Sequence, residues 1–231
     1  MGFTKTFRRV EVKYLLTESQ TQKFLKRIEP YVEKDLYFHT TINNVYYDTP
    51  SNDLIIKSIN KPMFKEKLRI RSYGTPNLNN QIFVEIKHKY KGVVGKRRVS
   101  MSLKEFYDFV STRSYDESNQ IMKEIAYLFQ HYKLVPKCFI AYDRNSYRGI
   151  LDSSLRITID TNLRSRRYDL KMELGDYGTS FFDTPHSIVE VKVLGAVPLW
   201  LSRIFTELQV YPRGFSKYGN IYKKESGLNV N

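Results

Sequence analysis

Cations occupy every second position of one short segment of the chain. Residues 65–71 read KEKLRIR, so the alternate positions hold Lys65, Lys67, Arg69 and Arg71. Side chains of a β-strand point alternately to opposite faces, so a strand here would place these cations on one face and Leu68 and Ile70 on the other, toward a core. Like charges in a row repel one another unless an anion lies opposite them. The spacing therefore predicts a sheet with one face that binds a polyanion.

The overall composition also favours an anionic partner. The 231 residues include 38 lysines and arginines and 24 aspartates and glutamates, a net charge of +14. This balance is typical of proteins that bind phosphates, nucleic acid or an acidic membrane surface, although solvated surface lysines would also produce it. The single cysteine, Cys138, excludes an internal disulfide and a metal site made of cysteines alone. The sequence shows no secretory signal and no apolar run of about 18 residues, so we expect a cytoplasmic location and no membrane segment.

Strands and helices must position these cations, and the sequence predicts both. Segments rich in Val, Ile, Tyr and Phe predict strands at 8–15, 43–48, 65–72, 81–90, 96–101, 138–147, 155–161 and 187–194. Apolar residues at helical spacing predict helices at 18–32, 103–113, 119–133 and 198–210. Thr17 with Gln20, and Ser102 with Glu105, have the spacing of capping boxes. No linker or repeat divides the chain, so we expect one domain over residues 1–231, with its core at 8–222.

Charged residues recur at alternate positions in most of the predicted strands. The aligned sets are Arg9, Glu11 and Lys13; Phe83, Glu85, Lys87 and Lys89; Tyr142 and Arg144; Arg156, Thr158 and Asp160; and Ile188, Glu190 and Lys192. The solvent face of an antiparallel sheet would explain any one of these strands. The combined set is strongly cationic, however, and the opposite faces are apolar and need the helices. We therefore predict an α+β fold in which an antiparallel sheet closes into a tunnel, with helices outside and cations inside.

Eight motifs, taken in order, make the chain resemble a known family. They are R-x-E-x-K-Y (Arg9 to Tyr14), VYYDT (Val45 to Thr49), LRIR (Leu68 to Arg71), FVEIK (Phe83 to Lys87), YDR (Tyr142 to Arg144), LRITID (Leu155 to Asp160), VEVKV (Val189 to Val193) and FSKY (Phe215 to Tyr218). Together they resemble the VTC (vacuolar transporter chaperone) domain, the polyphosphate polymerase domain of the triphosphate tunnel, or CYTH-like, superfamily. The resemblance runs from Arg8 to Tyr222.

The resemblance implies an eight-stranded antiparallel, barrel-like tunnel with helices outside. It also implies ATP and inorganic polyphosphate as substrates, and Mn²⁺ or Mg²⁺ as cofactor. The residues that match the family's catalytic, phosphate-binding cations are Lys13, Arg69, Arg71, Lys87, Arg144, Arg156 and Lys217. Further substrate-binding residues are expected at Glu11, Lys67, Glu85, Lys89, Lys96, Arg98, Tyr142 and Lys192. Alternation alone does not show which of Lys96, Arg97 and Arg98 faces the tunnel.

By the same resemblance, Glu190 matches the metal-binding acid of the family. Glu11 and Glu85 are weaker candidates for this role. A carboxylate together with phosphate oxygens is a common way to hold Mg²⁺ or Mn²⁺. The other explanation of Glu190 is a structural ion pair with Lys192 or with a facing arginine.

One departure from the superfamily bears on the reaction. CYTH-type triphosphatases and adenylate cyclases open with E-x-E-x-K, whereas this chain has Arg9 at the first glutamate position. The lost carboxylate favours the polymerase type. A triphosphatase, or a polyphosphate-binding module without turnover, is an alternative. Nucleic-acid binding is not expected, because it would need cations on an outer surface, and no oligomeric state is predicted.

Two other patterns carry no function. The run GVVGK at 92–96 is too short for a Walker loop and is expected to be a turn between strands. The four histidines are dispersed and lack the spacing of a zinc site.

Overall fold

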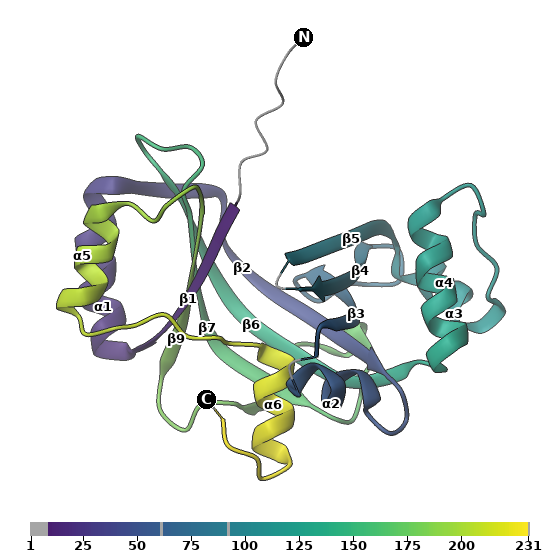
Figure 1. The fold of residues 1–231 in the computed structure, drawn as a ribbon. Helices are drawn as coiled ribbons and strands as arrows, with labels where there is room; N and C mark the ends of the chain where they lie inside the picture. The colour runs from purple at the N-terminus through teal and green to yellow at the C-terminus, as the bar shows by residue number, and fades with distance from the viewer. Residues whose placement is uncertain (1–8, 61, 92, 231) are drawn as a thin grey trace.

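One strongly curved antiparallel sheet dominates the computed structural model, which describes residues 9–60, 62–91 and 93–230 (Figure 1). Its strands follow one another in the order β1 (Arg9–Thr17), β9 (His186–Leu194), β7 (Arg156–Arg166), β6 (Val135–Gly149), β2 (Val32–Asp48), β3 (Phe64–Tyr73), β4 (Gln81–Tyr90) and β5 (Val93–Ser102). A short ninth strand, β8 (Thr179–Ser180), pairs with β7 beside this path. The prediction of an α+β fold built on an antiparallel sheet is confirmed; eight strands form the main path, and the two-residue β8 makes nine. Arg8 and Gly92, which the predicted first strand and the predicted turn include, lie outside the described residues.

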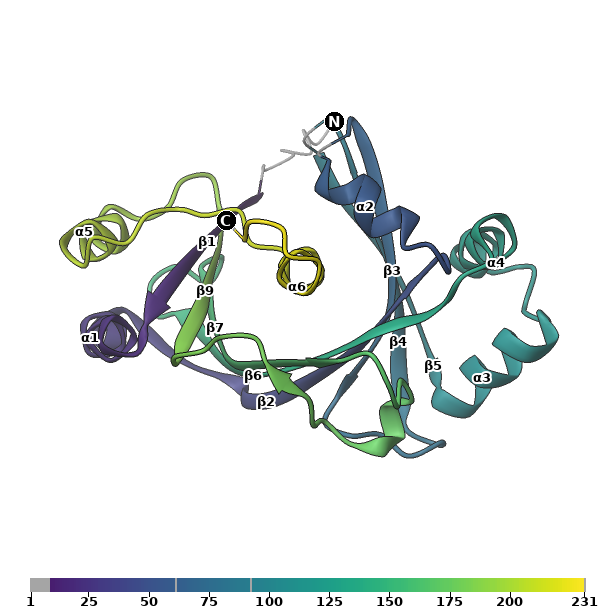
Figure 2. The same ribbon diagram turned by 90° about the horizontal axis from the view of Figure 1, so that it is seen from below.

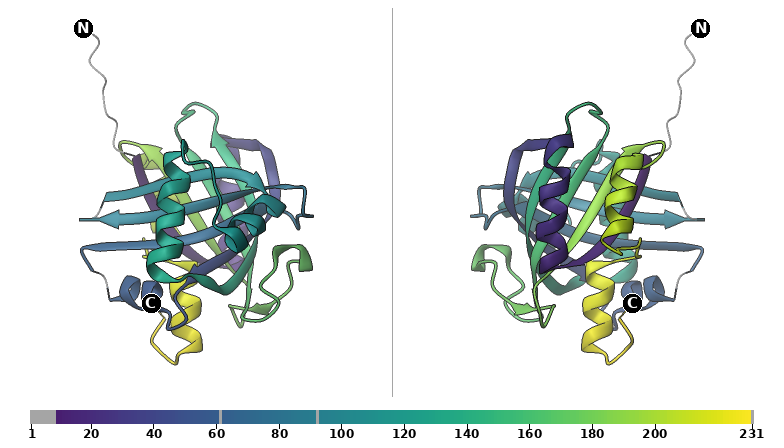
Figure 3. Two further views of the ribbon diagram at one scale, coloured as in Figure 1. Left: turned by 90° about the vertical axis from the view of Figure 1, so that its right-hand side faces the viewer. Right: turned by 90° about the vertical axis from the view of Figure 1, so that its left-hand side faces the viewer.

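A pair of helices covers each flank of the convex face (Figures 2 and 3). Helices α1 (Glu18–Ile28) and α5 (Leu199–Glu207) bury Phe24 and Phe205 against β1, β9 and β7. Helices α3 (Leu103–Thr112) and α4 (Gln120–Tyr132) bury Phe106 and Phe129 against β3 and β4. Burial of apolar surface contributes about 25 cal/mol per Å², so these two cores stabilise the curved sheet. No helix in the described ranges is long and apolar enough to cross a membrane.

Local chemistry explains where the elements begin and end. Both expected capping boxes are confirmed: Thr17 caps α1 with Gln20, and Ser102 caps α3 with Glu105. The predicted helix 18–32 ends early, because Pro30 stands in a 3₁₀ turn, η1 (Glu29–Tyr31), that leads into β2. Strand β2 has 17 residues and begins well before the predicted 43–48, because its polar first half pairs with β6 without an apolar alternation.

The sheet does not close, so the prediction of a closed tunnel is wrong. Within the described ranges, β1 and β5 are the two ends of the strand order and do not pair with each other. The outer edge of β1 is already occupied, because the backbone N–H of Arg213 donates to the carbonyl of Lys13 at 2.8 Å. The segment 210–216 and helix α6 (Lys217–Glu225) lie between the two flanks instead (Figure 2).

Two helices are not predicted by the sequence, and one of them corrects the expectation that all helices lie outside. Helices α2 (Asp53–Ile59) and α6 lie side by side, and α6 packs on the inner side of the curve near β6 (Figure 2). A third apolar cluster, which includes Tyr46, Ile140 and Tyr218, joins α6 to the concave face. The α6 sequence contains Gly219 and Asn220, which have low helix propensity, so burial rather than propensity stabilises this helix.

Candidate phosphate-binding site

The strand register places the predicted cations on the concave face of the sheet. Leu68 and Ile86 are buried in the convex core with α3 and α4, so the residues that alternate with them point to the concave side. Across β3, β4 and β5, the paired rows on this side are Lys65–Lys89, Lys67–Lys87–Lys96 and Arg69–Glu85–Arg98. Across β6, β7, β9 and β1, they are Arg144–Asp160, Thr158–Glu190–Lys13 and Arg156–Lys192–Glu11. Residues from both ends of the chain therefore line one surface.

Glu85 is the centre of the first group of charges. Its Oε2 accepts from Arg69 Nε at 2.8 Å and lies 2.7 Å from Arg69 Nη2, and its Oε1 lies 2.6 Å from Lys96 Nζ. Arg71 and Arg98 lie 4.0 and 3.8 Å from the same carboxylate. Burial would raise the pKa of Glu85, but the charges of the surrounding cations, Arg69 first, outweigh it and lower the pKa to about 2. The carboxylate is therefore ionised and fixes the arginines.

Asp160 is the centre of the second group, and Lys217 enters it from α6. Arg144 donates to both oxygens of this carboxylate, at 2.6 and 2.8 Å, and Lys217 Nζ donates to Oδ2 at 2.5 Å. Asp160 is buried, which would raise its pKa, but Lys217 and Arg144 hold the pKa well below its usual range. Tyr142 lies beside this group. Burial would raise the pKa of its hydroxyl, but the charges of Arg71, Arg144 and Lys217 outweigh burial and lower the pKa to about 8.

Glu190 is the centre of the third group, and lysines surround it. Its Oε1 lies 2.6 Å from Lys192 Nζ and its Oε2 lies 3.9 Å from Lys13 Nζ, which in turn lies 3.4 Å from Glu11. The pKa of Glu190 falls to about 2, because Lys13, Lys192 and Arg144 outweigh the effect of burial. The ion pair with Lys192, one of the two explanations of this residue, is thus present in the structure.

Lys67 and Lys87 lie where cations are close together. Burial, and then the neighbouring Lys65 and Lys87, lowers the pKa of Lys67 to about 7. Burial and then Lys13 lower the pKa of Lys87 to about 8. The Lys67 ammonium donates to Ser216 Oγ at 2.9 Å, at the start of α6. An anion bound between the two flanks would relieve this repulsion.

The register settles the open choice among Lys96, Arg97 and Arg98 and places Arg156 and Lys89 at the ends of the concave face. Lys96 and Arg98 share the concave face with Glu85, whereas Arg97 points to the other face and lies 3.3 Å from Glu124 of α4. Arg156 lies at the end of the concave face, 57% exposed, in an ion pair with Asp35 of β2. Lys89 is exposed near the end of β4, where it pairs with Lys65 near the start of β3.

Three residues of the site are absent from the sequence prediction. Asp160 is the carboxylate that holds Arg144 and Lys217, Tyr46 accepts from Arg69 Nη1 at 2.9 Å, and Asn44 accepts from Arg71 Nε at 3.0 Å. Asp160 shares its strand face with Arg156 and ends the LRITID motif, but neither signal identifies it as the partner of Arg144 and Lys217. Tyr46 stands within the VYYDT motif, but nothing in the motif identifies it as a partner of Arg69.

The side chains of the site provide only some of the ligands that a divalent metal needs. Within residues 9–60, 62–91 and 93–230, no group of three or more His, Cys, Asp or Glu side chains could hold a metal ion. Glu190 and Glu11 both lie near Lys13, so one or two carboxylates are available at one place. Mg²⁺ is commonly bound by one or two carboxylates together with substrate phosphates and waters. These residues therefore fit Mg²⁺ or Mn²⁺ if phosphate oxygens complete the coordination.

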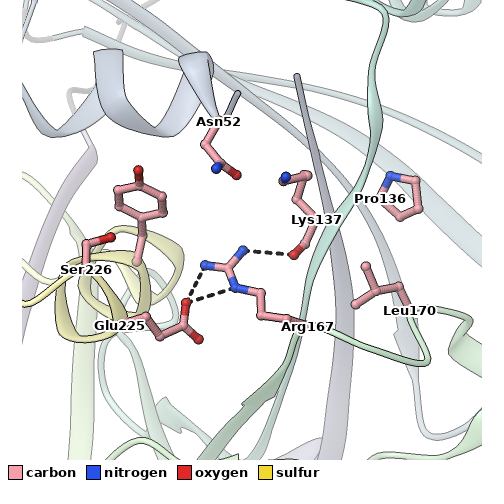
Figure 4. A pocket seen from close by; sticks show the side chains of 8 residues that line it. Asn52, Pro136, Lys137, Arg167, Leu170, Glu225 and Ser226 are labelled. Carbon is pink, nitrogen blue, oxygen red and sulfur yellow. Dashed lines mark hydrogen bonds and ion pairs between the residues drawn. The ribbon is translucent and has the colours of Figure 1, made fainter. Parts of the chain in front are cut away.

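A separate pocket of about 360 Å³ lies at the C-terminal end of α6 (Figure 4). Arg167 lines this pocket, and its guanidinium donates to Glu225 at 2.8 and 2.5 Å and to the Lys137 carbonyl at 2.8 Å. The Lys137 ammonium donates to the carbonyl of Pro50 at 3.0 Å. Both cations that line this pocket are thus already engaged, so we do not regard it as the phosphate site; its bonds anchor α6.

Solved structures of other proteins share this curved antiparallel fold, and two of them match nearly the whole chain. One is a Hippeastrum protein described as an adenylyl cyclase with a dominant triphosphatase activity, 16% identical, with a TM-score of 0.57 over 96% of this chain and 97% of that one. The other is a Bacillus halodurans protein named as an adenylate cyclase, 12% identical, with a TM-score of 0.55 over 90% and 93%.

The family is shown by the sequence match. Residues 8–225 match the VTC domain, and the chain belongs to this family. It is 26% identical over 222 residues to vacuolar transporter chaperone complex subunit 4 of Schizosaccharomyces pombe, covering 77% of this chain and 30% of that protein. It is 25% identical over 221 residues to the subunit 4 of Trypanosoma brucei brucei, covering 78% and 28%. The chain thus spans less than a third of the length of these relatives.

Proposed function

We propose that this chain is an ATP-dependent polyphosphate polymerase that works as one VTC-type domain. The observation that carries the proposal is the concave face, where lysines and arginines from both flanks outnumber the carboxylates between them. A threaded phosphate chain would neutralise a surface of this shape and charge. Membership of the VTC family supports the proposal.

The arginines and lysines are suited to different tasks. Arg69 and Arg144 are already oriented by Glu85 and Asp160, so their guanidinium groups are pre-positioned for phosphate oxygens. Lys13 and Lys87 have flexible side chains that can follow a moving chain. In phosphoryl transfer, such positioning and charge neutralisation do most of the catalytic work.

The proposed reaction needs no nucleophile from the protein. A terminal phosphate oxygen of the growing chain attacks the γ-phosphorus of ATP, the bond from this phosphorus to the β–γ bridging oxygen breaks, and ADP leaves. Glu190, with Glu11 nearby, would hold Mg²⁺ or Mn²⁺ together with phosphate oxygens. The metal would neutralise phosphate charge when bound. The role of each residue in this scheme is part of the proposal, as is the cytoplasmic location expected from the sequence.

One assay separates this proposal from its alternatives. The purified chain is incubated with ATP and Mn²⁺ or Mg²⁺, long polymer is detected by gel electrophoresis, and ADP and free phosphate are measured in parallel. Polymer with ADP supports the polymerase. Free phosphate without polymer would show a triphosphatase instead, and polyphosphate binding with neither product would show a binding module.

A further inference from the structure

Lys217 enters the site from a helix, so its position depends on how α6 is held. Its ammonium donates to Asp160 Oδ2 at 2.5 Å and lies 4.2 Å from the centre of the Tyr142 ring. A lysine side chain is flexible and has no fixed fork geometry. The backbone at the start of α6 must therefore be fixed by its neighbours if the ammonium is to stay beside Asp160.

The next residue, Tyr218, provides a fixed point. Its side chain is buried, its ring stacks on Tyr46 at a centroid distance of 4.6 Å, and its hydroxyl donates to Asp48 Oδ2 at 3.2 Å. Burial, and then the charge of Asp48, raises the pKa of Tyr218, so the hydroxyl keeps its proton and remains a donor. Tyr218 itself is not among the residues that contact a phosphate in the proposed reaction.

Asp48 is a rigid acceptor. Its carboxylate accepts from the backbone N–H groups of Thr49, Leu54 and Ile55 at 2.8, 2.9 and 3.0 Å. It thereby caps the first turn of α2, whose own N-cap residue makes no side-chain cap bond. Asp48 is also the last residue of β2, so it is fixed to the sheet.

We infer that Tyr218 is a positioning residue for Lys217. The bond from Tyr218 to Asp48 fixes the first turn of α6 to the end of β2, and this holds the Lys217 ammonium in the site. The inference rests on the proposed function in one respect, because it treats Lys217 as a ligand of phosphate. It assigns the VYYDT and FSKY motifs a joint task, because their Asp48 and Tyr218 meet across the fold.

The first test measures the exposure of Lys217 without any ligand. Tyr218→Phe removes only the hydroxyl. Tyr222→Phe is the matched control, because Tyr222 lies one turn along the same helix and lines the separate pocket. Lysines of the full chain are labelled with an acetylating reagent and quantified by mass spectrometry. We expect the labelling of Lys217, relative to that of Lys224, to rise about fivefold in Tyr218→Phe, because the lost hydrogen bond contributes about 1 kcal/mol to holding α6 in place. The ratio should be unchanged in Tyr222→Phe. An unchanged ratio in Tyr218→Phe would overturn the inference.

The second test is a double-mutant cycle on the binding of inorganic triphosphate, measured by calorimetry. We expect Lys217→Met to weaken binding about tenfold and Tyr218→Phe about threefold, and the double variant to bind like Lys217→Met alone. Effects that multiply in the double variant contradict a role of Tyr218 through Lys217. If the wild-type chain binds no triphosphate, the proposed function fails, whereas the labelling ratio still decides the inference.

Discussion

Glu85 and Glu190 lie on opposite flanks of the concave face and are neutralised in different ways. Arg69 holds Glu85 through Nε and Nη2, at 2.8 and 2.7 Å, and the Glu85 side chain is 1% exposed. Glu190 is 9% exposed and has lysines at 2.6 and 3.9 Å. An arginine fork has fixed geometry, whereas a lysine ammonium moves easily. The comparison indicates that Glu85 fixes the arginines of its flank. Under the proposed function, Glu190 would exchange its lysine partners for a metal ion.

The largest expected effect of this difference is on stability. Glu85→Gln should lower the free energy of unfolding by about 3 kcal/mol, because it leaves Arg69 and Arg71 close together without their carboxylate. Urea unfolding followed by circular dichroism measures this. Glu124→Gln is the control, because its partner Arg97 stands on the same sheet but on the convex face, and we expect a loss below about 1 kcal/mol. Equal losses in the two variants would break the comparison.

The second expected effect is on metal dependence. Glu190→Gln should cost less stability than Glu85→Gln, because its partners Lys13 and Lys192 are 22% and 34% exposed and their ammonium groups can turn to solvent. It should, however, abolish the increase in triphosphate affinity that Mg²⁺ or Mn²⁺ produces, as measured by calorimetry with and without metal. Glu33→Gln, which removes the partner of Arg148 at 2.9 Å, should keep that increase. A full metal response in Glu190→Gln would assign the metal to another carboxylate.

The smallest expected effect concerns pH and tests Lys67, whose pKa is lowered by burial and by its charged neighbours Lys65, Lys87, Lys13 and Arg69. The pKa of Lys67 is about 7 instead of 10.5, so a bound anion should promote its protonation. Triphosphate affinity should therefore rise as the pH falls from 8 to 6. This gain in affinity should be about threefold larger in the wild type than in Lys67→Met. The folded chain binds fewer protons at Lys67 than the unfolded chain between pH 7 and 10.5, so this group makes the free energy of unfolding rise with pH in that window. Identical pH profiles in the two proteins contradict this account.

Alternation of side chains carried most of the information that the sequence holds about the site. It identifies the residues on the concave face, because a strand turns every second side chain to the same side, and the register then brings Lys67, Lys87 and Lys96 into one row. It does not identify the partners. Asp160 lies with Arg144 through strand pairing and with Lys217 through the packing of α6, and neither relation is visible within a single segment.

Closure was mispredicted for a related reason. Alternation shows that a sheet has a cationic face, but it does not show whether the two end strands meet. The edge of β1 is occupied by the backbone at Arg213, a contact between residues far apart in sequence with no side-chain pattern to reveal it. Helix α6 was missed because its nine residues have weak helix propensity and are helical through burial.

The pairing of β1 has a consequence for how the protein is made. Within the described chain, β1 pairs in the sheet only with β9, and Arg9 lies opposite Leu194. Of the strands in this sheet, β1 is synthesised first, so its edge must wait for nearly all of the others before it is paired. Contacts of this length slow folding and leave a strand edge exposed in the meantime. Because Lys13 and Lys217 stand near opposite ends of the sequence, an incomplete nascent chain contains no complete site.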